Sequence, residues 1–194
     1  MNPVDYALLA KRAYTDAPTI GEADSASRMH VYGDVHCFRG TDDFESLLHD
    51  FDVALTDVPG MGKLHAGFWS AWQAIRDACL AMPVPSAITG HSLGAALAIL
   101  CAAEWALRGH AVPVYAFEPP RICGDDTLAR VYRDFSIPFY GTRNGLDIVT
   151  QVPPELSCPH VLTRIGTPSF SLDNLTDHGI GRVIAALQPE ASAG

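Results

Sequence analysis

The sequence is organised around a glycine- and serine-containing pattern, G-x-S-x-G, at residues 90–94. The apolar run 86–89 before it predicts a buried strand, and residues 93–107 after it carry helical spacing without a breaker. A serine at such a turn takes a strained backbone conformation, which the small flanking glycines permit. We therefore expect the Ser92 hydroxyl to stand clear of the backbone, with the Leu93 N–H placed to stabilise an acyl oxyanion. A turn of this kind can also serve only as a tight connection or an anion site.

Length and composition predict a single domain over residues 1–194. The 194 residues are 48% hydrophobic, which is enough for a sizeable core. A net charge of −9 argues against binding to nucleic acid or electrostatic attachment to anionic lipid. No stretch reaches the ~18 apolar residues of a membrane span, and the first residues lack the pattern of a signal peptide. On these grounds we expect no transmembrane segment and a cytoplasmic protein.

Apolar runs alternate with segments of helical spacing along the chain. We expect strands at residues 28–32, 35–39, 86–89, 112–117, 137–141 and 160–165, and helices at 3–14, 69–81, 93–107, 125–135 and 180–187. This alternation is typical of a mostly parallel sheet. The predicted fold class is α/β, with a mostly parallel central sheet and helices on both faces.

A further apolar stripe lies on the expected short helix at residues 42–52. Its members follow one another at helical spacing: Phe44, Leu47, Leu48 and Phe51. Such a stripe is explained either by ordinary core packing or by a lid that covers an acyl groove and turns outward at a lipid surface.

A serine nucleophile needs a histidine base, and the histidine needs a carboxylate to orient it. In α/β-hydrolases these residues follow in the order Ser, Asp or Glu, His. His178 precedes the last expected helix, whereas His110 and His160 have plainer explanations as a residue that follows a helix end and as the start of a strand. Asp147 follows an expected strand at the edge where open α/β sheets build their sites. The other acidic candidates fit helix starts, caps or turns: Asp125, Asp126, Asp173 and Asp177.

Several motifs occur in the order found in one family. They are Phe38-Arg39-Gly40-Thr41, His65-Ala66-Gly67-Phe68, Gly90-His91-Ser92-Leu93-Gly94-Ala95, Pro120-Arg121, Asp147-Ile148-Val149 and Asp177-His178. Over most of its length the chain thereby resembles the class 3 lipases of the α/β-hydrolase superfamily, in a compact form like those of bacteria or phages. The family's usual Gly-x-Pro-Arg reads Glu118-Pro119-Pro120-Arg121 here, and the segment over the site lacks the tryptophan often found in family lids.

The resemblance implies roles for individual residues. Ser92 would be the nucleophile, Asp147 the orienting acid and His178 the base. The backbone N–H groups of Thr41 and Leu93 would form the oxyanion hole. Asp50 would hold the Thr41 hydroxyl.

The resulting hypothesis is a serine carboxylic-ester hydrolase that cleaves acylglycerol or other lipid esters through an acyl-enzyme. It needs no cofactor and no metal, since the histidines are scattered and no H-E-x-x-H spacing occurs. The expected partners are a small-molecule or lipid ester and a transient lipid interface. Phospholipase A1 activity, general esterase activity and a catalytically silent binding module on the same fold remain alternatives. The motifs leave the oligomeric state open.

Overall fold

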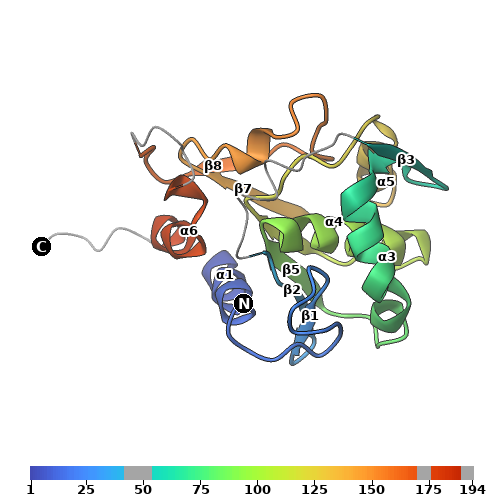
Figure 1. Ribbon diagram of the computed structural model, residues 1–194, viewed down its shortest axis with the longest axis horizontal. Coiled ribbons are helices and arrows are strands. Elements are labelled where there is room, and N and C mark those ends of the chain that lie inside the picture. The colour runs from blue at the N-terminus through green and yellow to red at the C-terminus, as the bar shows by residue number, and fades with distance from the viewer. Residues whose placement is uncertain (42–53, 170–175, 189–194) are drawn as a thin grey trace, which may run out of the picture.

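The computed structural model describes residues 1–41, 54–169 and 176–188. Its centre is a six-stranded sheet (Figure 1) in the order β1 (Met29–Tyr32), β2 (Val35–Phe38), β5 (Ala87–His91), β6 (Val114–Phe117), β7 (Phe139–Asn144) and β8 (Thr163–Ile165). Within this sheet β1 and β2 pair antiparallel, and the other neighbouring strands pair parallel. The remaining strands, β3 (Leu55–Val58) and β4 (Gly62–His65), form a separate hairpin. The expected mostly parallel sheet is confirmed.

Helices pack on both faces of this sheet, as expected. On one face lie α1 (Pro3–Arg12) and α6 (Ile180–Leu187), which contact each other (Figure 1). The other face carries α3 (Ala66–Leu80), α4 (Leu93–Leu107) and α5 (Thr127–Asp134). Each face has its own cluster of buried apolar side chains. The sheet is therefore buried on both sides, as a parallel sheet requires.

The central helix α4 is enclosed by protein on all sides. Every residue from Leu93 to Ala106 is buried, because the sheet lies below the helix and α3 and α5 flank it. A helix that is apolar around nearly its whole circumference is typical of a buried core position. Its N-terminus is consequently fixed at the end of β5, directly after Ser92.

Two glycines allow β5 and α4 to meet at this point. A Cβ at Gly94 would overlap the carbonyl oxygen of Phe38 on the neighbouring strand, and a Cβ at Gly90 would overlap the carbonyl oxygen of Gly94. These are backbone atoms, which cannot move aside as a flexible side chain can. The predicted close approach of strand and helix is confirmed.

We expect Gly94→Ala to lower the free energy of unfolding by at least about 1–3 kcal/mol, because the new methyl group forces the β2 and α4 backbones apart. Gly181→Ala in α6 is the matched control, since its Cβ would point into open space. It should leave the unfolding free energy unchanged or raise it by up to about 1 kcal/mol. Urea denaturation measures both. Equal midpoints for Gly94→Ala and wild type would contradict the close approach.

The boundaries differ from the expected ones where tertiary contacts decide them. Helix α3 starts at Ala66 rather than near residue 69, because the His65 side chain accepts a hydrogen bond from the Gly67 N–H and caps it. Strand β8 is shorter than expected, since pairing with β7 begins only at Thr163. Within the described ranges, no helix combines the length and apolar character needed to cross a bilayer.

Candidate active site

Ser92 occupies the sharp turn between β5 and α4. Its φ of 58° and ψ of −128° lie outside the regions that a residue with a side chain ordinarily adopts. Its backbone N–H donates to the carbonyl of Phe117 on β6 at 2.9 Å, which ties the turn to the sheet. The Ser92 Oγ is buried and makes no hydrogen bond within the described part of the chain. The turn thus has the strained geometry that the sequence pattern predicts.

Asp147 and His178 meet beside this turn, although 31 residues separate them. Asp147 follows the end of β7, and His178 ends the 3-10 turn Thr176–His178 that precedes α6. The Asp147 Oδ2 and His178 Nδ1 are 3.0 Å apart, and the carboxylate is fully buried. We assign the Nδ1 proton to this contact, since a carboxylate oxygen can only accept.

Burial opposes ionisation of Asp147, but its hydrogen bonds outweigh that effect. Glu118 and His178 contact the carboxyl group, and the Val149 N–H donates to Oδ1 at 2.9 Å. Together they hold the pKa of Asp147 below its ordinary value. An ionised carboxylate here can orient the imidazole of His178 and stabilise it when it becomes charged.

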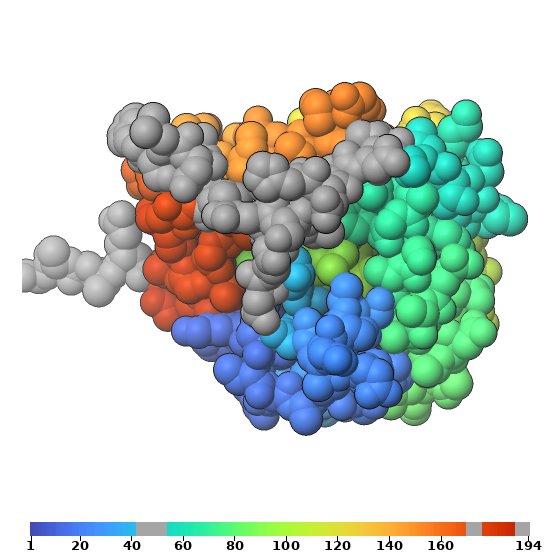
Figure 2. Space-filling view, in the orientation of Figure 1, coloured from blue at the N-terminus to red at the C-terminus, as the bar shows by residue number. Residues whose placement is uncertain are grey.

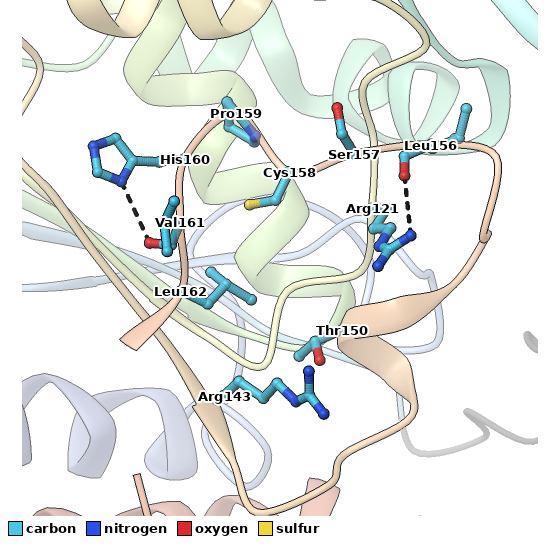
Figure 3. A pocket seen from close by; sticks show the side chains of 10 residues that line it. All are labelled: Arg121, Arg143, Thr150, Leu156, Ser157, Cys158, Pro159, His160, Val161 and Leu162. Atoms are coloured by element: carbon cyan, nitrogen blue, oxygen red, sulfur yellow. Dashed lines mark hydrogen bonds between the residues drawn. The ribbon is translucent and has the colours of Figure 1, made fainter. Parts of the chain in front are cut away.

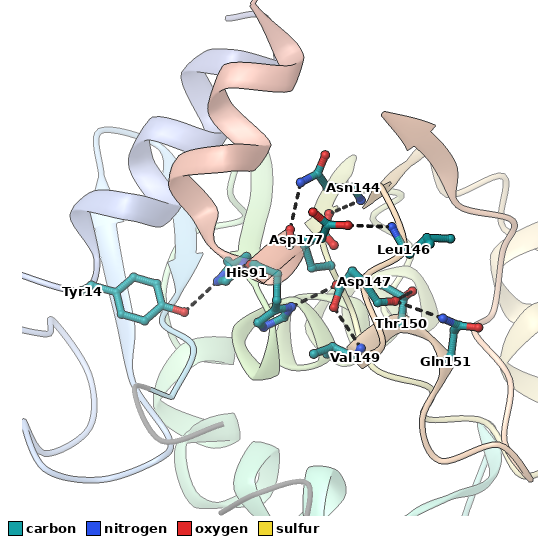
Figure 4. A network of polar contacts seen from close by, with 11 residues as sticks. Tyr14, His91, Asn144, Leu146, Asp147, Val149, Thr150, Gln151 and Asp177 are labelled. Carbon is teal, nitrogen blue, oxygen red and sulfur yellow. Dashed lines mark hydrogen bonds and ion pairs between the residues drawn. The ribbon is translucent and has the colours of Figure 1, made fainter. Parts of the chain in front are cut away.

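His91, the residue before Ser92, fixes the backbone of His178, and Figure 4 shows its contact with Tyr14. Its Nε2 donates to the His178 carbonyl at 2.8 Å, and its Nδ1 accepts from the Tyr14 hydroxyl at 2.8 Å. The two imidazole rings lie 4.7 Å apart. Burial, together with the nearby His178, lowers the pKa of His91 to about 3, so His91 stays neutral. The sequence did not single out His91, because its partners lie 77 and 87 residues away.

Asp177 lies in the 3-10 turn before α6, in line with its expected place in a turn or cap, and its side chain is a buried anchor. Its carboxylate is fully buried and accepts from the backbone N–H groups of Leu146 and Ser169 at 3.0 Å each. The Arg182 guanidinium lies 3.6 Å away. Burial alone would raise the pKa of Asp177, but these contacts lower it. Asp177 therefore ties the loop that carries Asp147 to the turn that carries His178 (Figure 4).

Glu118 is a second buried carboxyl at the site. It follows the end of β6 with a left-handed φ of 54°, and its Oε1 accepts from the Asn144 N–H at 2.8 Å. Potential ligand atoms of Glu118, Asp147 and His178 lie within 4.8 Å of one another. A metal ion bound by these three residues would have to break the contact between Asp147 Oδ2 and His178 Nδ1. These two potential ligand atoms are therefore already occupied by each other. Sequence reasoning noted Glu118 only as a departure from the family pattern.

The remaining expected residues differ in how far the structure describes them. Leu93 is buried at the first position of α4. Thr41 is half-buried and follows Gly40, where an added Cβ would meet the His91 carbonyl oxygen at 2.7 Å. The segment before Thr41 therefore lies against the turn at Ser92, and the oxyanion role of Thr41 stays a prediction. Five expected residues lie outside the described residues: Phe44, Leu47, Leu48, Asp50 and Phe51.

A cavity of about 570 Å³ adjoins the Asp147 loop (Figure 3). Arg143 and Thr150, on either side of that loop, line it together with residues 156–162. The Arg121 guanidinium donates to the carbonyls of Pro154 and Leu156, so it builds the cavity wall. None of Ser92, Asp147 and His178 lines this cavity.

Figure 2 shows the face of the molecule that carries α1 in blue, α3 in green and α6 in red.

Comparison with known proteins gives a consistent set of relatives. The family model described as "Lipase (class 3)" matches residues 35–157. The lipase of Rhizopus niveus is 34% identical over 134 residues, which cover 61% of this chain and 34% of the relative. The lipase of Rhizomucor miehei is 27% identical over 157 residues, covering 73% and 42%. A secreted mono- and diacylglycerol lipase of Fusarium solani is 33% identical over 106 residues, covering 50% and 31%. The chain thus spans less than half the length of these three relatives.

Solved structures show the same architecture. The crystal structure of a lipase from Rhizopus microsporus var. chinensis superposes with a TM-score of 0.67 at 24% identity, covering 88% of this chain and 75% of that one. The propeptide complex of the Rhizomucor miehei lipase gives a TM-score of 0.64 at 20% identity, covering 84% and 67%. These likenesses concern the fold, and the predicted α/β-hydrolase fold is confirmed.

Two expectations about origin and location are not upheld. The cytoplasmic location is contradicted, because relatives from Fusarium solani and Malassezia globosa are named secreted lipases. The suggested bacterial or phage-borne form is not borne out, since the named relatives are fungal. Both expectations relied on features such as the first residues, which carry no information on location in a chain that spans only part of its relatives.

Proposed function

The chain belongs to the class 3 lipase family, and on that premise we propose that it hydrolyses carboxylic esters, with acylglycerols or other lipid esters as substrates. The observation that carries the proposal is the buried Asp147–His178 contact beside a strained serine turn. A serine, a histidine and a carboxylate in this order and arrangement supply the groups that acyl transfer needs. Residues 1–194 would act as one domain, in contact with an ester substrate and, transiently, with a lipid interface.

The reaction would proceed in two symmetrical halves. His178 Nε2 takes the proton of the Ser92 hydroxyl as Oγ attacks the ester carbonyl, while Asp147 stabilises the imidazolium. The tetrahedral oxyanion accepts hydrogen bonds from the N–H groups of Thr41 and Leu93, each worth about 3 kcal/mol of barrier. Collapse expels the alcohol, which takes its proton from His178. Water then repeats the sequence on the acyl-enzyme and releases the acid.

A panel of esters tests this proposal. It should contain tri-, di- and monoacylglycerols of several acyl lengths, phosphatidylcholine and short p-nitrophenyl esters, with Ser92→Ala run beside wild type. We expect wild type to release fatty acid from acylglycerols and Ser92→Ala to release almost none. Acyl-enzyme formation is checked independently by mass-spectrometric detection of a fluorophosphonate adduct on Ser92.

Each alternative predicts a different result from the same panel. Release of acid from phosphatidylcholine in preference to acylglycerols would assign phospholipase activity. Turnover of the short esters alone would assign a general esterase. Lack of turnover together with lack of Ser92 labelling would refute a hydrolase and favour a silent binding module.

A further inference from the structure

One buried ionisable group takes no part in the reaction outlined above. The Glu118 side chain is fully buried at the carboxyl end of β6, between the Asp147 loop and β7. One of its oxygens accepts from the Asn144 N–H, and the other, Oε2, has no N–H or O–H donor among the described residues. A buried carboxylate with one bare oxygen is costly, whereas a protonated carboxyl can turn that oxygen into a donor.

The acceptor that such a donor requires lies next to it. A carboxyl oxygen of Asp147 lies within 4.8 Å of one of Glu118, and the contact between the two groups raises the pKa of Glu118 and lowers that of Asp147. Two carboxyl groups can form a hydrogen bond with each other only if one of them carries a proton. Asp147 is the better anion, because His178 Nδ1 and the Val149 N–H both face it. The shared proton therefore belongs to Glu118.

We propose that Glu118 is a positioning residue that keeps its proton at neutral pH and donates it in a hydrogen bond to Asp147, which extends the row of Ser92, His178 and Asp147 by a fourth member. The backbone supports a role for this side chain. A φ of 54° is strained for a residue with a Cβ and comfortable for glycine. Here a glutamate occupies this strained backbone position, and its side chain reaches the site.

The pKa of Glu118 agrees with this arrangement. Burial raises it well above the ordinary value, and the neighbouring charge of Asp147 raises it further. The hydrogen bond from Asn144 and the charge of Arg143 on β7 act in the opposite direction and do not outweigh them. Of the two histidines nearby, His91 is neutral and His178 faces Asp147 rather than Glu118.

The proton on Glu118 sets how strongly Asp147 attracts the proton of His178. A donor to Asp147 draws negative charge away from the oxygen that faces His178, so the imidazole loses its proton more readily. The base is then available at lower pH. This consequence rests on the proposed function, whereas the protonation of Glu118 itself does not.

The first test is therefore independent of turnover. Carbon-13 NMR of protein labelled at the glutamate carboxyl carbons, with the Glu118 resonance assigned from its loss in Glu118→Gln, reports the charge directly. We expect this resonance to have the chemical shift of a protonated carboxyl at pH 7, while that of exposed Glu155 has the shift of a carboxylate. An ionised Glu118 at pH 7 would overturn the proposal, whether or not the protein hydrolyses esters.

The second test compares pH profiles of kcat/KM on a soluble ester. Glu118→Gln keeps the shape and a neutral donor, so its acidic limb should coincide with that of wild type. Glu118→Gly removes the donor and relieves the backbone, so its acidic limb should move to higher pH by about half to one unit. Glu155→Gln, which removes an exposed carboxylate, is the control for a general change of charge.

The sign of the shift separates the explanations. If Glu118 were ionised in wild type, both variants would lose a negative charge near His178 and their acidic limbs would move to lower pH. If Glu118 had only a structural role, all limbs would coincide and only the free energy of unfolding would change. Either result overturns the proposal. Should Glu118→Gly fail to fold, Glu118→Gln and the carboxyl resonance still decide.

Discussion

Replacing Ser92 or His178 with Ala is expected to lower kcat for ester hydrolysis by about 10⁴- to 10⁶-fold, because nucleophile and base act as one unit. The double variant should be hardly slower than either single variant. The Ser92 side chain is small, and the groups around His178 have other hydrogen-bond partners as well, so both variants should fold. Burst and steady-state kinetics on a chromogenic ester, with urea denaturation of each variant, measure the effect.

His160→Ala is the matched control for this experiment. His160 is exposed, and its ring stacks on Phe139 at 5.2 Å, whereas the contact with Asp147 is made by His178. This variant should keep nearly the full rate. If His160→Ala abolished turnover and His178→Ala did not, the choice of base would be wrong.

Asp147→Asn is expected to lower kcat by about 10⁴-fold with little change in KM. An asparagine amide can donate to His178 Nδ1, which favours the tautomer whose proton sits on Nε2. That tautomer cannot accept the Ser92 proton, although every residue keeps its place. The steady-state constants of wild type and Asp147→Asn on one soluble ester provide the measurement.

Asp57→Asn on strand β3 removes an exposed carboxylate and should leave the constants unchanged. A higher KM with an unchanged kcat in Asp147→Asn would assign Asp147 to substrate binding instead. Equal rates for Asp147→Asn and wild type would remove it from the mechanism.

Much of the fold follows from local patterns in the sequence. The bounds of α4 and α6 agree with the expected 93–107 and 180–187, because each is an apolar segment that ends before a clear helix breaker. The turn at Ser92 follows from two glycines whose spacing leaves few other conformations. The β3–β4 hairpin was not expected as such, since its strands alternate weakly and are partly exposed.

The polar surroundings of the site were harder to predict. Asp147 and His178 were selected from chain order and strand ends, and they do meet. His91, Glu118 and Asp177 each have partners on other elements that lie 26 to 87 residues away in the sequence. A histidine beside a serine, or a glutamate before two prolines, looks the same in sequence whether it is solvated or buried. Burial, which gives these groups their chemistry, is set by the whole fold.

The shared anchor at Asp177 has a consequence for how this region opens. Its carboxylate accepts from Leu146 in one loop and from Ser169 in another, and its own backbone carbonyl accepts from the Asn144 side chain at 2.9 Å. Releasing either loop leaves a buried anion short of donors, at a cost of about 1.5–3 kcal/mol for each charged hydrogen bond. The positions of the loops that hold Asp147 and His178 are thus thermodynamically coupled. States in which one loop is detached are scarcely populated, so the acid and the base keep or lose their positions together.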